Sequence, residues 1–258
     1  MIRKLFLNIW LNLKYFSRSY LLLAVIIMIL YYVFTFVPFI ARNPIKSAAE
    51  ILVQMHIIAA VTVILLSILV LNDPLKNRNL KMIITKPCPP EIWSASCFLT
   101  VNLVSLGLHL VIMAFAVVSV LLHSDLKLIP YLYSWLLSLM GLMIFSSFIL
   151  FLTSVIPPAL TVVSLLILNN FYLFNLFDYC FKYDGNMFLN IFYKTMGVII
   201  YAVYLIVPTF FPYEKMYDLI YGNTVDWPYL CVFSSYAVIA MVFYWLLSVY
   251  FVKRKNLI

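Results

Sequence analysis

Charged side chains are scarce in this sequence. They make up 10% of its 258 residues, whereas hydrophobic side chains make up 66%. A soluble domain carries about 25% charged and 45–50% apolar residues, because its surface must remain polar. The composition therefore excludes a soluble enzyme, a nucleic-acid-binding domain and a disordered chain. We expect lipid to surround most of this protein.

The sequence also lacks the motifs of catalysis and nucleotide binding. It contains no HExxH, no serine elbow and no GxxxxGK[ST] loop. Its nine acidic residues fall in predicted loops or at the ends of apolar segments, whereas ion-coupled carriers place such groups at mid-bilayer depth. The four cysteines have neither metal-ligand nor disulfide spacing. We therefore predict that the chain is not an enzyme and binds no cofactor or metal, and we disfavour a secondary transporter.

Two histidines, His56 and His109, lie within long apolar segments. A histidine near mid-bilayer depth is either a proton or metal site or a neutral imidazole that hydrogen-bonds a neighbouring helix. The spacing offers His109 no second metal ligand, so the hydrogen-bonded imidazole is favoured.

Long hydrophobic runs are what the sequence has in abundance. A helix needs about 20 mostly apolar residues to cross about 30 Å of hydrocarbon. Six runs meet this need, and a shorter seventh covers 196–211; the six are 20–41, 51–71, 93–122, 131–156, 159–181 and 229–252. The sequence therefore predicts an all-α, polytopic integral membrane protein.

The positive charges distinguish six crossings from seven. If 196–211 does not cross, eleven of the 17 Lys and Arg residues lie on the cytoplasmic side; if it crosses, nine do. The positive-inside rule therefore favours six transmembrane helices with both termini in the cytoplasm. Pro208 and Pro212 interrupt the weak run, as in a re-entrant or surface helix. Residues 182–227 are then an extracytoplasmic or re-entrant segment before the last span.

The N-terminus has an amphipathic pattern. Ile2, Phe6, Ile9, Leu13 and Phe16 recur at helical spacing, and most basic residues fall between them. This pattern predicts an interfacial helix over residues 1–19, an elbow that turns into the first span. The alternative is a longer, tilted first span with a basic flank.

Four residues of the fifth predicted span have two open interpretations. Amide side chains in hydrocarbon must find partners, so this helix cannot face lipid on all sides. The amides either bond neighbouring helices, or they line a translocation path or subunit contact together with an aromatic side chain. The residues concerned are Asn169, Asn170, Phe174 and Asn175.

Two stretches carry a family resemblance. In 80–98, LKMIITKPCPPEIWSASCF, an apolar turn that ends in a proline precedes a run that re-enters the membrane. In 207–258, a short amphipathic stretch and Asp226-Trp227-Pro228 precede the last span, and FVKRKNL closes the chain. With the basic N-terminal helix, this layout resembles the membrane subunit (permease) of ABC transporters of the type-2 exporter family.

The resemblance implies a single transmembrane permease domain over residues 1–258, with a coupling helix in the cytoplasmic loop 72–92. It implies two ABC ATPase subunits that hold ATP and Mg, a second copy or a sister permease, and a bacterial inner membrane. The alternative for the loop is a solvated basic connector. The residues expected to contact the ATPase are Asp73, Leu80, Met82, Ile83, Ile84, Lys86 and Glu91.

The function expected from this layout is export of an amphipathic or hydrophobic cargo such as a peptide, a lipid or a drug. The aromatic content of 17% suits such a cargo, although aromatic side chains also form belts at membrane interfaces. The alternative function is a non-catalytic membrane scaffold or assembly factor, which would use the same spans without moving anything.

Overall fold

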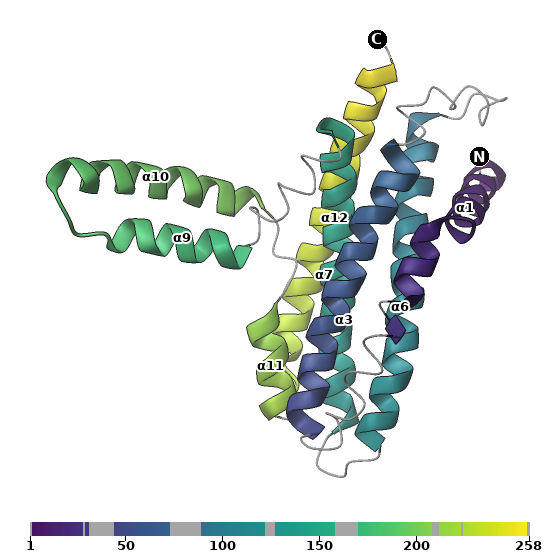
Figure 1. Ribbon diagram of the computed structural model, residues 1–258, viewed down its shortest axis with the longest axis horizontal. Coiled ribbons are helices and arrows are strands. Elements are labelled where there is room, and N and C mark those ends of the chain that lie inside the picture. The colour runs from purple at the N-terminus through teal and green to yellow at the C-terminus, as the bar shows by residue number, and fades with distance from the viewer. Residues whose placement is uncertain are drawn as a thin grey trace. The chain divides into compact units, whose positions relative to one another are not determined.

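The structure of the protein is a computed structural model. It describes residues 2–27, 29–30, 44–72, 89–121, 127–157, 170–207, 212–222 and 224–256. Within these ranges the regular structure is helical and no β-strand occurs, which confirms the all-α prediction (Figure 1). The chain divides into two compact units, unit 1 (Met1–Val155 and Phe210–Ile258) and unit 2 (Ile156–Thr209).

Unit 1 contains most of the helices. After α1, the chain turns at Arg18 and Ser19, where the Ser19 hydroxyl donates to the Phe16 carbonyl, and it is helical again from Tyr20. The helix α3 continues into the π-helical turn η1. The elements of unit 1 are α1 (Ile2–Ser17), α3 (Pro44–Ser67), η1 (Ile68–Asn72), α6 (Pro90–Leu121), α7 (Leu128–Val155), α11 (Tyr213–Gly222) and α12 (Trp227–Asn256).

Three helices of the described chain are long and apolar enough to cross a membrane. They are Glu91–Val111 in α6, Leu128–Val155 in α7 and Trp227–Arg254 in α12. Each overlaps one of the predicted spans. The protein is thus a helical, membrane-embedded protein, as the composition predicts.

Helix α7 forms the centre of unit 1. In its apolar segment 67% of the residues are buried inside the protein, against 22% in α12. Small residues on α7, including Ser138, Gly141 and Ser147, are fully buried. Small side chains let helix backbones approach closely, which is how helices associate where lipid offers no hydrophobic driving force. Accordingly α3, α6, α11 and α12 all contact α7.

Helices α7 and α12 run parallel. Near the start of α7, the Tyr133 hydroxyl donates to the carbonyl of Asp226, which directly precedes α12. Near their ends, the rings of Phe151 and Phe251 lie 6.0 Å apart. Val155 and the beginning of α11 therefore lie at opposite ends of unit 1, because the Ser134 hydroxyl also contacts the Met216 carbonyl. These two points are therefore separated by about the length of α7, or about 40 Å.

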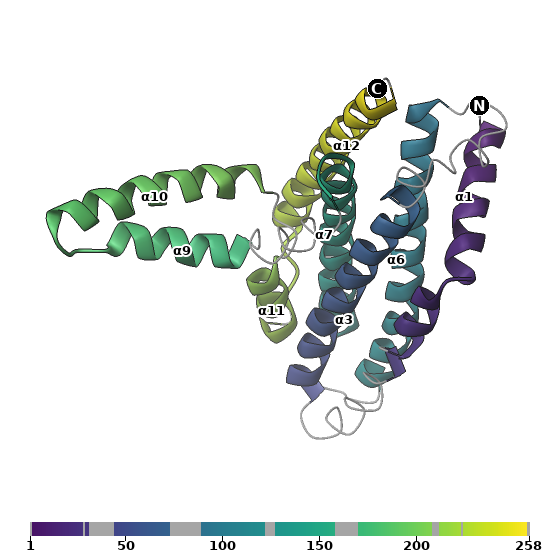
Figure 2. The ribbon, with the colours of Figure 1, turned by 45° about the horizontal axis from the view of Figure 1, so that its top comes forward.

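Four chain segments meet at the Val155 end of unit 1. Glu91, in the first turn of α6, forms an ion pair with Lys253 near the end of α12. The Cys97 thiol lies 4.0 Å from the Val70 carbonyl of η1, so α3 ends where α6 begins. Asn12 of α1 contacts Thr100 of α6 at 3.4 Å. Figure 2 shows the N-terminal end of α1 and the end of α12 at this same end of unit 1, with α1 running on beside α6.

Unit 2 is a hairpin of two antiparallel helices, α9 (Asn170–Lys182) and α10 (Met187–Ile206). Aromatic pairs hold it together: the rings of Phe177 and Tyr201 lie 5.3 Å apart, and those of Tyr183 and Tyr193 lie 4.2 Å apart. At Gly197 a side chain would approach the Phe181 ring to 2.8 Å, so a glycine there lets the helices close up.

The weak predicted segment 196–211 belongs to a longer helix. Helix α10 begins at Met187, nine residues before the predicted start. Lys194 and Asn190 lower the hydropathy of this region, but neither interrupts helical hydrogen bonding. The prediction of one permease domain over the whole chain is not decided by the division into two units and stays a prediction.

Candidate functional site

Most of the predicted site residues lie outside the described part of the chain. This applies to the coupling residues Asp73, Leu80, Met82, Ile83, Ile84 and Lys86 and to Asn169. The backbone of Asn170, Phe174 and Asn175 lies in α9, but their side chains are not among those described. The roles assigned to these residues stay predictions. Glu91 is the one predicted site residue whose side chain the structure describes.

Glu91 ties the chain that leaves the 73–88 region to the end of α12. Its carboxylate pairs with the Lys253 ammonium, and both side chains are about half exposed. The helix dipole stabilises a carboxylate in the first turn of a helix and a cation in the last turns. Glu91 and Lys253 occupy such positions in α6 and α12. An exposed pair of this kind contributes little to stability, and it shows that the start of α6 lies beside the end of α12. Sequence spacing could not reveal it, because the partners are 162 positions apart.

A second polar cluster lies in the core, where α3, α6 and α7 meet. His56 Nδ1 lies 2.6 Å from the Ser138 hydroxyl, and His109 Nε2 lies 3.4 Å from the same hydroxyl. The two imidazole rings pack edge to face with their centroids 6.0 Å apart. A hydroxyl has one proton, so Ser138 donates to one imidazole and accepts from the other. All three side chains are buried.

The cluster confirms that His109 hydrogen-bonds a neighbouring helix, and it adds His56 and Ser138, which the sequence did not connect to it. A shared hydroxyl between two imidazoles can pass a proton from one ring to the other, or simply fix the rotation of three helices. Among the described side chains, no group of three or more His, Cys, Asp or Glu residues could hold a metal ion.

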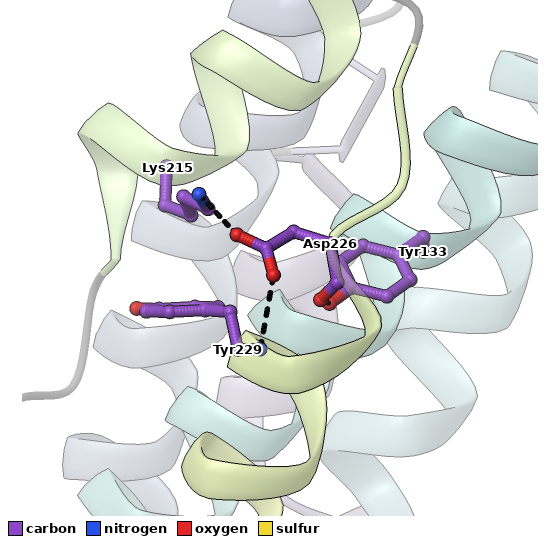
Figure 3. Close-up of polar contacts among 4 residues, drawn as sticks. All are labelled: Tyr133, Lys215, Asp226 and Tyr229. Atoms are coloured by element: carbon purple, nitrogen blue, oxygen red, sulfur yellow. Dashed lines mark hydrogen bonds and ion pairs between the residues drawn. The ribbon is translucent and has the colours of Figure 1, made fainter.

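A third cluster joins α7, α11 and α12 at the opposite end of unit 1 (Figure 3). Asp226 occupies its centre. One carboxylate oxygen caps α12 by accepting the Tyr229 backbone N–H at 3.1 Å, and the other pairs with the Lys215 ammonium at 2.6 Å. The Asp226 carbonyl accepts the Tyr133 hydroxyl. Lys215 also lies over the Tyr229 ring, 5.3 Å from its centroid. We call these four residues the Asp226 clamp.

The clamp changes the acidity of its two charged groups. The Lys215 ammonium and then the Tyr229 N–H hold the pKa of the Asp226 carboxyl below its usual range. The Asp226 carboxylate in turn raises the pKa of Lys215. The sequence shows Asp226-Trp227-Pro228 as the start of a span, and an aspartate before a helix is a typical N-cap. The ion pair to α11 depends on the tertiary fold.

The clamp predicts a specific pH dependence. Because the folded-state pKa of Asp226 is lowered, its contribution to stability is present above about pH 4 and is lost as pH falls through the folded-state pKa. Because the pKa of Lys215 is raised, its contribution is present below about pH 10 and is lost above the folded-state pKa. Asp226→Asn keeps a good N-cap but removes the charge, so we expect a lower thermal unfolding midpoint at pH 7 and a smaller loss on acidification.

The measurement is detergent-solubilised thermal unfolding between pH 3 and pH 7. Asp184→Asn, in the exposed turn of unit 2, is the matched control, and its acid loss should equal that of the unchanged protein. An identical acid loss in Asp226→Asn and in the unchanged protein would contradict the clamp.

The buried cluster predicts a small stability effect. Ser138→Ala removes the oxygen that both imidazoles contact, so we expect a decrease in the free energy of unfolding of about 0.6–1.7 kcal/mol, the range measured for hydrogen bonds between membrane helices. The measurement is unfolding in mixed micelles followed by tryptophan fluorescence. Ser235→Ala is the control, because the exposed Ser235 hydroxyl bonds only within α12. An equal decrease in the free energy of unfolding in both variants would show that the contacts of Ser138 with the two imidazoles do not stabilise the fold.

Comparison with protein-family models, with curated proteins and with solved structures gives no match to this chain.

Proposed function

We propose that the chain is the membrane-spanning permease subunit of an ATP-driven exporter, with six crossings and both termini in the cytoplasm. The observation that carries the proposal is the parallel packing of α7 and α12. It requires residues 156–212 to lead back along the length of α7, which in a bilayer means an odd number of crossings. Helix α3 runs toward the Val155 end of unit 1 and α6 runs away from it, because the Cys97 thiol near the start of α6 lies beside the Val70 carbonyl of η1.

The N-terminal helix supports an elbow at the cytoplasmic surface. Helix α1 buries Ile9 and Phe16, and it exposes large apolar residues such as Phe6 and Trp10 together with Arg3 and Lys4. A helix that exposes apolar and basic groups side by side suits the headgroup region of a membrane. The turn at Arg18 and Ser19 then redirects the chain toward the first span.

The loop at 73–88 is proposed to dock on the partner ATPase, which supplies ATP and Mg. The ion pair between Glu91 and Lys253 would link movement of the docked loop to α12. Pressure on the loop would displace the start of α6, and the ion pair would carry that movement to the end of α12. Rigid-body movement of helices is a common way to open and close a path between two subunits.

The proposal also covers a partner permease, a membrane and a cargo. The permease would pair with a second copy or a sister permease in a bacterial inner membrane, and the cargo would be an amphipathic or hydrophobic molecule. The apolar and aromatic helices support such a cargo. A non-catalytic scaffold would use the same spans, and it is distinguished by the ATPase experiment below.

The topology predicts that both chain ends face the cytoplasm. Reporter fusions active only in the cytoplasm, placed after residue 258 and before residue 1, should both be active. A fusion inserted in the turn 183–186 should be inactive, and it serves as the control for exposure on the other side. Ends on opposite faces would contradict an even number of crossings and remove the docking surface.

The coupling role predicts loss of ATPase association when the apolar part of the loop is removed. Replacing residues 80–84 with Gly and Ser should abolish co-purification of an ATPase and its stimulation by the permease. The physical reason is that the apolar side chains Met82, Ile83 and Ile84 provide the contact area. ATPase pull-down and ATP hydrolysis in proteoliposomes measure the effect.

Two further variants sharpen this experiment. The same replacement at 182–186, which is equally long but lies in the turn of unit 2, should leave association intact. Glu91→Lys should reduce stimulated ATP hydrolysis without preventing association, and adding Lys253→Glu should restore it. If the 80–84 variant transports normally, the scaffold or another function replaces the exporter proposal.

A further inference from the structure

An apolar groove runs between α6 and α12 on the surface of α7. Its volume is about 300 Å³, and no polar atom faces it. The side chains that matter for the argument are Ala95 and Phe98 of α6, Met143 of α7, and Val238, Met241 and Trp245 of α12. We call it the α6–α12 groove. All of these residues belong to unit 1 and to helices that can cross a membrane.

The groove lies at the depth of lipid acyl chains. Along α12, Trp245 is eight residues and Val238 fifteen residues before Lys253, or about 12 and 22 Å at the rise of an α-helix. One leaflet contributes about 15 Å of hydrocarbon. A lipid whose headgroup lies beside Lys253 would therefore place the inner half of one acyl chain in the groove.

The end of unit 1 above the groove is basic. Lys253 and Arg254 lie on α12, and Glu91 balances one of them. Helix α1 contacts α6 and carries no acidic residue; its N-terminal end lies at this end of unit 1 (Figure 2), and Arg3 and Lys4 are in its first turn. A basic cluster at the membrane surface attracts anionic headgroups. The charge is therefore complementary to an anionic lipid and not to a zwitterionic one.

The shape of the groove argues against a protein occupant. A second copy of the chain would need small residues on the exposed face of α12, because membrane helices associate through small side chains. That face instead presents Ile239, Val242, Phe243 and Leu246. A peptide backbone would find no polar partner in the groove, and such groups are costly when unpaired in an apolar site.

We propose that the α6–α12 groove binds one acyl chain of an anionic phospholipid, with the headgroup held beside Lys253 and Arg254. The site goes beyond the proposed function: it rests on unit 1 alone and requires neither an ATPase nor transport. Its success or failure is therefore separate from that of the exporter proposal.

Trp245 provides a built-in probe of the site. Bromine atoms near the middle of an acyl chain quench tryptophan fluorescence on contact. The full-length chain is placed in nanodiscs of phosphatidylcholine that contain a small mole fraction of brominated phosphatidylglycerol or, in parallel, brominated phosphatidylcholine. The signal of Trp245 is the difference between the unchanged protein and Trp245→Phe. We expect half-maximal quenching by the anionic lipid at an about fivefold lower mole fraction, the preference that one basic side chain provides near an anionic surface.

Two pairs of variants test the headgroup and the chain separately. Arg254→Gln should reduce the preference for the anionic lipid, whereas Lys127→Gln, at the opposite end of α7, should not. Ala95→Phe fills the groove and should reduce quenching by both lipids, whereas Leu103→Phe, exposed on α6 outside the groove, should leave it unchanged. Arg254 is exposed at a helix end, so that arm remains informative even if Ala95→Phe does not fold.

Two results would overturn the proposal. Equal quenching by both brominated lipids would mean ordinary lipid contact without a site. Quenching by neither lipid would mean that another part of the assembly, such as a second copy, covers the groove. Saturable quenching by phosphatidylglycerol that depends on Arg254 supports it.

Discussion

The packing of α12 along α7 in the same direction is the constraint on which the rest of unit 1 depends. Two parallel helices in one chain force the connecting segment to return over their whole length. This requirement is independent of the charge distribution, which separately places the basic loops and termini on one side. The packing thus constrains the segment between α7 and α12, and the charge distribution separately favours the even number of crossings proposed above.

Polar side chains have distinct tasks at three depths of this apolar bundle. At one end, the Asp226 clamp caps α12 and joins it to α7 and α11 through a carboxylate, an ammonium and a tyrosine hydroxyl. In the centre, the Ser138 hydroxyl contacts one ring nitrogen of His56 and one of His109. At the other end, Glu91 and Lys253 form an exposed pair. Charged pairs lie where water reaches them, and the buried cluster relies on neutral hydrogen bonds, as the cost of burying charge requires.

The two exposed ends of unit 1 differ in what they can respond to. The basic end carries the proposed ATPase contact and the proposed lipid headgroup site, so both would act on the same helices, α6 and α12. The clamp end has the Asp226 carboxylate at its centre, which is the group that acid would neutralise. The basic end would therefore contact the ATPase and the lipid, while the clamp end holds α7, α11 and α12 together.

The sequence by itself determined the helical class, the membrane setting and the positions of α6, α7 and α12, because uninterrupted apolar runs of about 20 residues match the length of a membrane-spanning helix and not that of a strand. It also predicted that His109 bonds a neighbouring helix. It did not predict that α10 begins at Met187, because Asn190 and Lys194 weaken the hydropathy signal while leaving the helix intact. Only the tertiary structure decided which helices are neighbours. The pairs Glu91 with Lys253, Lys215 with Asp226, and His56 with Ser138 depend on the rotation and direction of whole helices, and no local pattern encodes these.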